Sequence, residues 1–299
     1  MRLRRTELST PGSNESMMQK AAASNADLVF LDLEDAVSPN EKVAARGKVI
    51  TALKTLNWGK KTRAVRVNSL DTEYAYQDII QVVEEAGEYL DIIIIPKVKE
   101  ARDVWWVDVL LSQIEQRIKL SKRIGLEALI EEVEAMVNAE QIARASPRLE
   151  ALIFGPGDYS ASQGVTTGTI GGDSELYPGD IWHYARNKVI IAARAAGIVA
   201  VDGPYSAFRD LDGYRRECQR AFVLGAVGKW AIHPGQIAVA HEVFSPTQQE
   251  VERARKLVKA YEEARVQGLG AVAIDGDMVD AASVRILQKT LQMADLIGM

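Results

Sequence analysis

Short runs of apolar and β-branched residues alternate along this chain with longer segments in which apolar residues recur at helical spacing. Continuous apolar runs, rather than alternating ones, are typical of strands that are buried on both faces, as in parallel sheets. Most intervals between the runs have the length of one helical crossover, and the interval after Phe154 is longer. We identify eight candidate strands, at residues 4–9, 28–34, 63–68, 91–96, 124–131, 151–154, 198–202 and 228–232.

Eight strand–helix units predict an α/β protein with the (β/α)8 architecture of a TIM barrel. A doubly wound open sheet is the competing fold. It would usually show fewer strands, and the first candidate strand is not followed by the Gly-x-Gly-x-x-Gly pattern of dinucleotide-binding sheets. The intervals carry amphipathic segments, for example at residues 112–122 and 132–143, and a helix is predicted to begin at Asn40.

The pattern changes after Ser245. Residues 247–267 predict one long charged helix, a glycine-rich stretch follows, and a last helix is predicted at residues 281–297. We therefore expect a barrel catalytic domain over residues 1–244 and a C-terminal helical extension over residues 245–299. A tail of about 55 residues is too short for an independent core. We expect it to act either as a cap on its own barrel or as a lid that reaches an adjacent subunit.

Composition and charge mainly exclude function classes. Hydrophobic residues make up 47% of the chain and charged residues 26%, as in globular proteins. The net charge of −5 argues against a nucleic-acid surface, and the absence of an 18-residue apolar run argues against a membrane span. One cysteine, Cys218, excludes an internal disulfide framework and a multi-cysteine metal site. No apolar segment follows the basic residues 1–5, so we expect no signal peptide and a cytoplasmic protein.

Ionisable residues gather where the predicted strands end. Because the active site of a TIM barrel lies at the carboxyl ends of its strands, these side chains are expected to share one rim. Each would cost desolvation free energy unless it is paired or functional. The residues at these ends are Asp32, Glu34, Asp35, Arg66, Lys97, Glu131, Asp158, Asp202 and His233.

The residue types at this rim indicate a metal and an anion site. Carboxylates without a cluster of His or Cys indicate hard oxygen ligands, so the expected metal is Mg²⁺ or Mn²⁺ rather than zinc. Glu131 and Asp158, at the ends of adjacent strands, suit this role. Arg66 offers a planar fork for a carboxylate or a polarised carbonyl. The turn at residues 10–14, with Arg5 before it and Lys20 after it, is a candidate phosphate site.

The same residues form motifs of a known family. Over nearly its whole length the chain resembles the citrate lyase β-subunit-like, or HpcH/HpaI aldolase, superfamily. The motifs are Pro11-Gly12-Ser13, Asp32-Leu33-Glu34-Asp35-Ala36-Val37, Arg66-Val67-Asn68, Ile95-Pro96-Lys97-Val98, Ile130-Glu131, Phe154-Gly155 with Asp158, and Ile232-His233-Pro234. Further motifs resemble malyl-CoA/β-methylmalyl-CoA lyases. These are Asn57-Trp58-Gly59-Lys60-Lys61, Ile170-Gly171-Gly172, Asp202-Gly203-Pro204 with Phe208, Gly228-Lys229-Trp230-Ala231, and Gly276-Asp277-Met278-Val279-Asp280.

This resemblance implies roles for individual residues. It implies that Glu131 and Asp158 bind Mg²⁺, that Arg66 contacts the glyoxylate-derived part of the substrate, and that Asp280 comes from an adjacent subunit as acid/base. The assembly implied is a homotrimer or a homohexamer. The remaining implied residues are Arg5 and Lys20 at the coenzyme A site, Gly157 at the substrate, and Asp32, Glu34 and Asp35, which support the residues that bind metal and substrate.

The activity that the resemblance implies is a Mg²⁺-dependent, reversible Claisen-type cleavage. L-malyl-CoA or β-methylmalyl-CoA would give glyoxylate and acetyl-CoA or propionyl-CoA, and citramalyl-CoA, giving pyruvate and acetyl-CoA, is a close variant. Two alternatives on the same fold stay open: a malyl-CoA thioesterase, and a citrate lyase β-subunit that uses an acyl carrier protein. A barrel used only for binding would predict a broken set of site residues, whereas Arg66, Glu131, Asp158 and Asp280 are all present.

Overall fold

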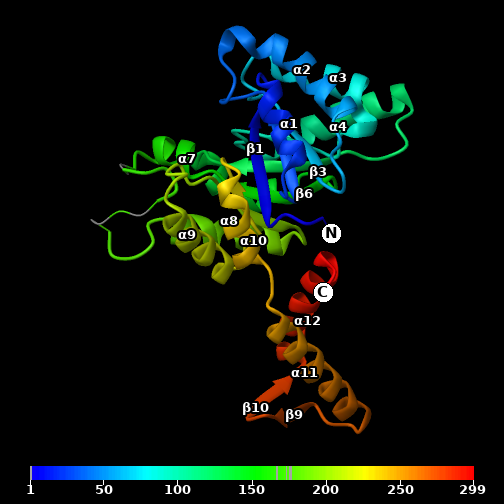
Figure 1. The fold of residues 1–299 in the computed structure, drawn as a ribbon, viewed down its shortest axis with the longest axis vertical. Helices are drawn as coiled ribbons and strands as arrows, with labels where there is room; N and C mark the ends of the chain where they lie inside the picture. Colours follow the sequence, from blue (N-terminus) through cyan, green and yellow to red (C-terminus); the bar gives the residue numbers. More distant parts are fainter. Residues whose placement is uncertain (1, 166–167, 173, 175–176) are drawn as a thin grey trace. The chain divides into compact units, whose positions relative to one another are not determined.

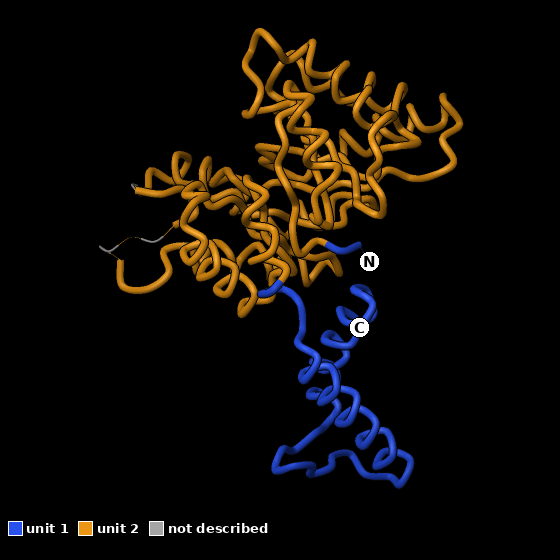
Figure 2. The backbone as a smooth tube through the Cα atoms, viewed as in Figure 1, with its two compact units in different colours: residues 1–3, 242–299 blue, residues 4–241 orange. Residues whose placement is uncertain are grey.

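The computed structural model describes residues 2–165, 168–172, 174 and 177–299. The chain divides into two compact units, which are coloured separately in Figure 2. The larger unit is Arg4–His241, and the smaller consists of Met1–Leu3 and Glu242–Met299. The division falls within helix α10 (Gly235–Phe244).

The larger unit is a closed barrel of eight parallel strands, which confirms the predicted fold class. Each strand pairs with the next along the chain, and β8 pairs with β1 to close the ring. All eight predicted strands are present, and five of them end one or two residues earlier than predicted. The strands are β1 (Thr6–Pro11), β2 (Leu28–Asp32), β3 (Thr62–Arg66), β4 (Ile92–Ile95), β5 (Gly125–Ile130), β6 (Leu149–Phe154), β7 (Val199–Asp202) and β8 (Lys229–Ala231).

Helices follow the strands around the barrel (Figure 1). Local signals begin several of them: the Asn14 side chain accepts a hydrogen bond from the Met17 N–H, and Glu100 forms a capping box with Asp103. The helix predicted at residues 132–143 is interrupted at Asn138. The helices up to the division are α1 (Glu15–Ala23), α2 (Lys42–Thr55), α3 (Ala75–Ala86), α4 (Ala101–Ile118), α5 (Val133–Val137), α6 (Ala139–Ile142), α7 (Pro156–Gln163), α8 (His183–Ala195), α9 (Leu211–Leu224) and α10, with short 3-10 helices at Pro39–Glu41 and Gly87–Tyr89.

The barrel interior is filled by apolar side chains from every level of the sheet. Phe30 and Trp230 pack with their ring centroids 4.4 Å apart. At the amino end of the strands the filling becomes charged, because Arg4, Glu7 and Glu127 are buried there. The apolar residues of this core are Leu28, Phe30, Ala64, Ile92, Ile94, Leu129, Ala151, Ile153, Val199, Val201 and Trp230.

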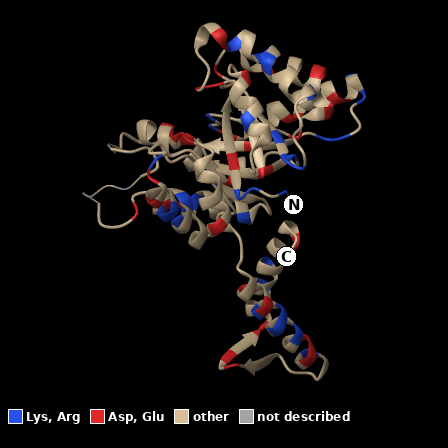
Figure 3. Ribbon diagram, in the orientation of Figure 1, with Lys and Arg blue, Asp and Glu red and all other residues tan. Residues whose placement is uncertain are grey.

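The smaller unit contains α11 (Gln248–Val266), a two-stranded sheet and α12 (Ala281–Ile297). Both helices agree with prediction, and side chains of both charges lie along α11 (Figure 3). The glycine-rich stretch was not predicted to be a hairpin, yet β9 (Ala271–Ile274) and β10 (Asp277–Asp280) pair antiparallel. Asp275 and Gly276 both have positive φ, as a tight hairpin turn requires.

The tail also buries a small apolar cluster of its own, made of Leu257, Tyr261, Val279 and Val284. The expectation that the tail is too short for an independent core stays a prediction. Val279 of the hairpin packs in this cluster with residues of both α11 and α12. In the described part of the chain, no helix combines the length and the apolar character needed to cross a membrane.

Candidate active site

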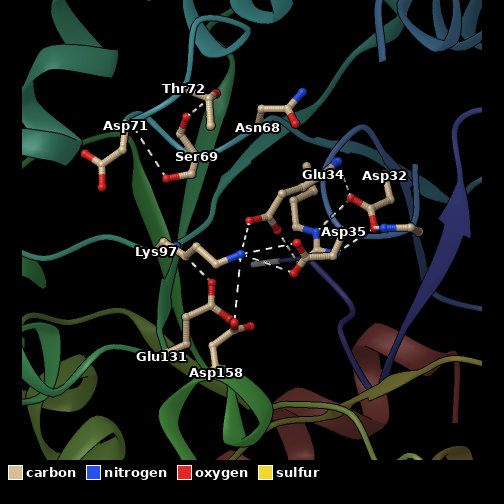
Figure 4. Close-up of polar contacts among 12 residues, drawn as sticks. Asp32, Glu34, Asp35, Asn68, Ser69, Asp71, Thr72, Lys97, Glu131 and Asp158 are labelled. Carbon is tan, nitrogen blue, oxygen red and sulfur yellow. Dashed lines mark hydrogen bonds and ion pairs between the residues drawn. The ribbon is translucent and has the colours of Figure 1, made fainter. Parts of the chain in front are cut away.

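The carboxyl ends of the strands bring together side chains that are far apart in sequence. Asp32 ends β2 and Arg66 ends β3, Glu131 follows β5 directly, and Asp158 lies in the first turn of α7. Glu34 and Asp35 come just after β2. Figure 4 shows these acidic residues around Lys97, which lies just beyond β4. We refer to Asp32, Glu34, Asp35, Glu131 and Asp158 as the rim carboxylates.

Arg66 is held rigidly at this rim. Its Nε and Nη2 donate to the two oxygens of Asp32 at 2.8 and 2.6 Å, and Nη1 lies 2.9 Å from Glu34 Oε2. Its guanidinium lies 5.5 Å from the ring centroid of Trp230. Burial alone would lower the pKa of Arg66, but the Asp32 carboxylate outweighs that effect and raises it. Arg66 is thus a fixed, permanent positive charge.

Among the rim carboxylates, Glu131 has a strongly raised pKa. Its Oε1 accepts a 2.8 Å hydrogen bond from the backbone N–H of Lys97. Burial raises the pKa of Glu131 to about 8; the negative charges of Glu34 and Asp158 add to the shift, and Arg66 opposes it. A divalent cation beside Glu131 would favour its ionised form.

Gly155 makes room for Glu131. A Cβ atom at residue 155 would lie 2.6 Å from both Cβ and Oε2 of Glu131, which is closer than van der Waals contact allows. The end of β6 must therefore carry glycine if the Glu131 carboxylate is to keep its position. The motif Phe154-Gly155 thus has a steric explanation in this structure.

The donor set fits a hard divalent cation. Five rim carboxylates face two cations, Arg66 and Lys97, and both cations are paired with them. No group of three or more His, Cys, Asp or Glu side chains among the described residues is already arranged around one metal position. A Mg²⁺ site takes one or two protein carboxylates and completes its octahedron with water and substrate oxygens. Glu131 and Asp158 are the residues that would hold the ion.

Lys42 and Asp78, which sequence reasoning missed, hold the segment after β2 in place together with Asn68 of the predicted motif. Lys42 Nζ donates to the backbone oxygens of Leu33 and Glu34 at 3.1 and 3.0 Å and to Asn68 Oδ1 at 2.6 Å. The Asn68 side-chain amide in turn donates to Asp78 Oδ2 at 2.7 Å. Helical periodicity gives no signal for a residue such as Lys42, because a lysine on an amphipathic helix is predicted to lie on the solvent-exposed face.

The structure does not bring Arg5 to the rim. Arg5 precedes β1, at the amino end of the barrel, and binds Asp27 through its backbone N, Nε and Nη2 at 3.0, 2.8 and 2.7 Å. Arg5 thus precedes β1 (Thr6–Pro11), whose last two residues begin the turn at residues 10–14, and its contact with coenzyme A stays a prediction. Lys20 is exposed in the last turn of α1, and Gly157 lies beside Asp158 in α7.

Two other residues at predicted strand ends have structural partners. Asp202 binds Arg186 Nε at 3.1 Å and Lys229 Nζ at 2.5 Å, so it belongs to a buried ion network rather than to the rim carboxylates. His233 accepts a hydrogen bond from the Gly235 N–H through Nδ1 at 3.0 Å and stacks on Phe208.

Asp280 belongs to the smaller unit, where it begins α12. Its Oδ1 accepts hydrogen bonds from the backbone N–H and the hydroxyl of Ser283, both at 2.8 Å. These hydrogen bonds hold the pKa of Asp280 below its ordinary value, and the one from the backbone N–H has the larger effect. Asp280 is therefore ionised and is a weaker base than an ordinary carboxylate.

Comparisons with known proteins show what this chain is similar to. A family model described as HpcH/HpaI aldolase/citrate lyase matches residues 5–234. An L-malyl-CoA/β-methylmalyl-CoA lyase from Cereibacter sphaeroides is 43% identical, covering 98% of this chain and 95% of the relative. A (3S)-malyl-CoA thioesterase from the same species is 37% identical, covering 98% and 95%. The solved CitE protein of Mycobacterium tuberculosis, in complex with magnesium, acetoacetate and coenzyme A, superimposes with a TM-score of 0.76 at 25% identity, covering 97% of each chain.

Proposed function

This chain belongs to the HpcH/HpaI aldolase/citrate lyase family and is homologous to malyl-CoA lyases, which are carbon–carbon lyases, and from that premise we propose its specific reaction. The proposal is a Mg²⁺-dependent, reversible cleavage of L-malyl-CoA or β-methylmalyl-CoA. The products are glyoxylate and acetyl-CoA or propionyl-CoA. Cleavage of citramalyl-CoA to pyruvate and acetyl-CoA is a variant that the same site chemistry allows.

One observation supports the proposal most directly. Two charged groups lie at the mouth of the barrel. Arg66 supplies a guanidinium held in place by Asp32, and Glu131 supplies a buried carboxyl group close to the negative charges of Glu34 and Asp158. The first suits the carboxylate and oxo oxygens of a small 2-oxo acid. The second, with Asp158, suits a divalent cation that binds the same oxygens. A 2-oxo acid therefore meets positive charge from two sides.

In the proposed mechanism, bound Mg²⁺ supplies Lewis acidity at the oxygen of the 2-oxo acid. Arg66 would bind that acid through the N–H groups of Nη1 and Nη2 that Glu34 and Asp32 do not use. Its charge is fixed before the reaction, so it stabilises the developing oxyanion without reorganisation. In the cleavage direction the substrate hydroxyl loses its proton, and its C–O bond becomes the carbonyl of the 2-oxo acid as the carbon–carbon bond breaks. The electrons of that bond pass to the acyl-CoA as an enolate, and a proton is returned to the enolate carbon.

We propose Asp280 of a neighbouring subunit as the group that carries this proton, in a homotrimer or a homohexamer. Its ionised state suits proton removal from acetyl-CoA or propionyl-CoA in the condensation direction. The C-terminal extension would then act as a lid that keeps water from the enolate. The proposed contacts of coenzyme A are Arg5, Lys20 and the turn at residues 10–14.

A condensation assay tests the proposal. Acetyl-CoA or propionyl-CoA is combined with glyoxylate or pyruvate, with and without Mg²⁺ or Mn²⁺, and the new acyl-CoA is identified by mass. Condensation with glyoxylate that requires the metal supports the lyase. The thioesterase alternative is favoured by the 37% identical relative, and it predicts release of malate and free coenzyme A from malyl-CoA without glyoxylate. A requirement for an acyl carrier protein would instead select the citrate lyase β-subunit.

A further inference from the structure

Lys97 contacts the rim carboxylates with both its backbone and its side chain. It lies just after β4 in a left-handed backbone conformation, with φ of 49°, which is unfavourable for a residue other than glycine. This conformation directs its N–H to Glu131 Oε1 at 2.8 Å. Figure 4 shows its side chain extending across the mouth of the barrel toward Glu34 and Asp35. An unfavourable backbone conformation beside the rim carboxylates indicates a functional constraint at Lys97.

The ammonium of Lys97 is shared among carboxylates from two strand ends. Nζ lies 2.5 Å from Glu34 Oε1, 3.2 Å from Asp35 Oδ2 and 3.9 Å from Asp158 Oδ1. The other cation of the rim, Arg66, is committed to Asp32 and Glu34. Within the described residues, Lys97 is thus the cation that forms an ion pair with Asp158.

A divalent cation and Lys97 compete for the same groups. The proposed metal ligands are Glu131, which binds the Lys97 N–H, and Asp158, which pairs with its Nζ. A cation that binds these carboxylates is repelled by the ammonium beside them, and this repulsion is weakly screened at a partly buried site. Without a metal, the ammonium offsets part of the mutual repulsion of the same carboxylates.

We propose that Lys97 is the internal counter-cation of the metal site. It stabilises the rim carboxylates when no metal is bound, lowers the affinity of the site for Mg²⁺, and gives up Asp158 when the metal binds. Lys97 is a positioning residue in this role, since it acts through the carboxylates and not on the reacting atoms. The inference rests on the magnesium site proposed above.

The test measures Mg²⁺ affinity by titration calorimetry and the melting temperature with and without Mg²⁺, on the full chain. Lys97→Met is expected to bind Mg²⁺ about tenfold more tightly than the wild type, because the repulsion is removed. Without metal it is expected to melt at a lower temperature, so that Mg²⁺ raises its melting temperature by more. Lys97→Arg keeps the charge and is expected to restore an affinity near that of the wild type.

Lys99→Met is the matched control. Lys99 pairs with Asp71 at 2.7 Å, and the two side chains are 43% and 71% exposed. Its substitution removes the same charge two residues along the chain, away from the rim carboxylates. We expect its Mg²⁺ affinity to stay within about twofold of the wild type, since exposed charges are well screened.

Mg²⁺ binding by Lys97→Met that is equal to or weaker than that of Lys99→Met overturns the inference. If the wild type binds Mg²⁺ and Glu131→Gln does not, the proposed metal site stands and only the role of Lys97 fails. A wild-type protein that binds no Mg²⁺ contradicts both proposals. Lys97→Gln removes the charge and keeps a hydrogen-bond donor, and it provides the same comparison if the methionine variant does not fold.

Discussion

Asp32 and Arg66 face each other as register partners at the ends of β2 and β3, joined by two hydrogen bonds of 2.8 and 2.6 Å between the guanidinium and the carboxylate. The pair is buried, so each charge depends on the other. This relationship orients the guanidinium and leaves Nη1 directed toward Glu34. Asp32 thereby determines where a bound anion would meet Arg66.

The first prediction concerns Asp32→Asn. Asparagine has nearly the same shape, but it cannot accept both hydrogen bonds, and it leaves Arg66 with Glu34 as its remaining ion-pair partner. Loss of one partner from a buried ion pair lowers the free energy of unfolding by about 3 kcal/mol or more. Urea unfolding of the variant measures this loss. We expect kcat/KM for the condensation to fall at least about a hundredfold. Asp71→Asn, in an exposed ion pair, should change both quantities little, and near-normal turnover by Asp32→Asn would contradict the orienting role.

The second prediction concerns Gly155→Ala. The added Cβ would lie 2.6 Å from Glu131 Cβ and Oε2, so the Glu131 side chain must move. Mg²⁺ affinity is expected to fall about tenfold or more, because metal ligands tolerate little displacement. Gly47→Ala is the control: it lies in α2 with no atom within 4 Å of the added Cβ, and it should stabilise the protein by about 0.5–1 kcal/mol. Unchanged Mg²⁺ binding by Gly155→Ala would remove the steric argument.

The third prediction concerns the pH dependence of stability. Glu7 is fully buried; its Oε2 accepts a 2.8 Å hydrogen bond from Trp230 Nε1, and Oε1 has no hydrogen-bond partner in the described structure. Burial, and then the charge of Glu127, raises the pKa of Glu7 well above its ordinary value of 4.5, while Arg4 opposes the shift. A carboxyl group with a raised folded-state pKa stabilises the fold fully below the unfolded-state pKa. That contribution is lost as pH rises toward the folded-state pKa.

Glu7→Gln separates this effect from other titrations. Glutamine is neutral at every pH, so the difference in unfolding free energy between Glu7→Gln and the wild type should grow in favour of the variant from about pH 5 toward alkaline pH. Urea unfolding at a series of pH values measures it. A difference that does not depend on pH would mean that Glu7 keeps its ordinary pKa.

The fourth prediction concerns Asp280→Asn. Asparagine is as good an N-cap as aspartate, so α12 should still begin at this residue and the melting temperature should change little. Turnover should fall about a hundredfold or more, since an amide cannot carry the proton. Ser283→Ala is the control, because it removes a hydrogen bond to Asp280 but leaves the carboxylate in place. Its loss of turnover should be much smaller.

Subunit mixing tests whether Asp280 acts on a neighbour. Asp280→Asn and Glu131→Gln subunits lack different parts of the proposed site. Co-assembled subunits should regain activity, because some sites then combine a native Glu131 from one subunit with a native Asp280 from another. Mixtures that stay as inactive as either variant alone would argue against a shared site.

The sequence by itself determined the eight strands, the barrel, the last two helices and the resemblance to the family. Apolar runs and helical spacing are local signals, and the order of the motifs needs no coordinates. The rim carboxylates were predictable for the same reason, because parallel strands that close into a barrel must end at one edge. The hairpin after α11 was not predicted, because apolar and polar residues do not alternate clearly along its strands. The Asp275-Gly276 turn is its main sequence signal.

Tertiary structure alone decided which charges work together. Sequence analysis proposed Arg5 for a phosphate or coenzyme A site and placed Asp202 and Lys97 at strand ends. Arg5 binds Asp27 at the amino end of the barrel, and Asp202 binds Arg186 outside the rim carboxylates. Lys97 instead crosses to Glu34 and Asp158. The partner of a charge depends on the direction in which its side chain leaves the backbone and on what other elements bring to that side. Neither is encoded by spacing along one strand.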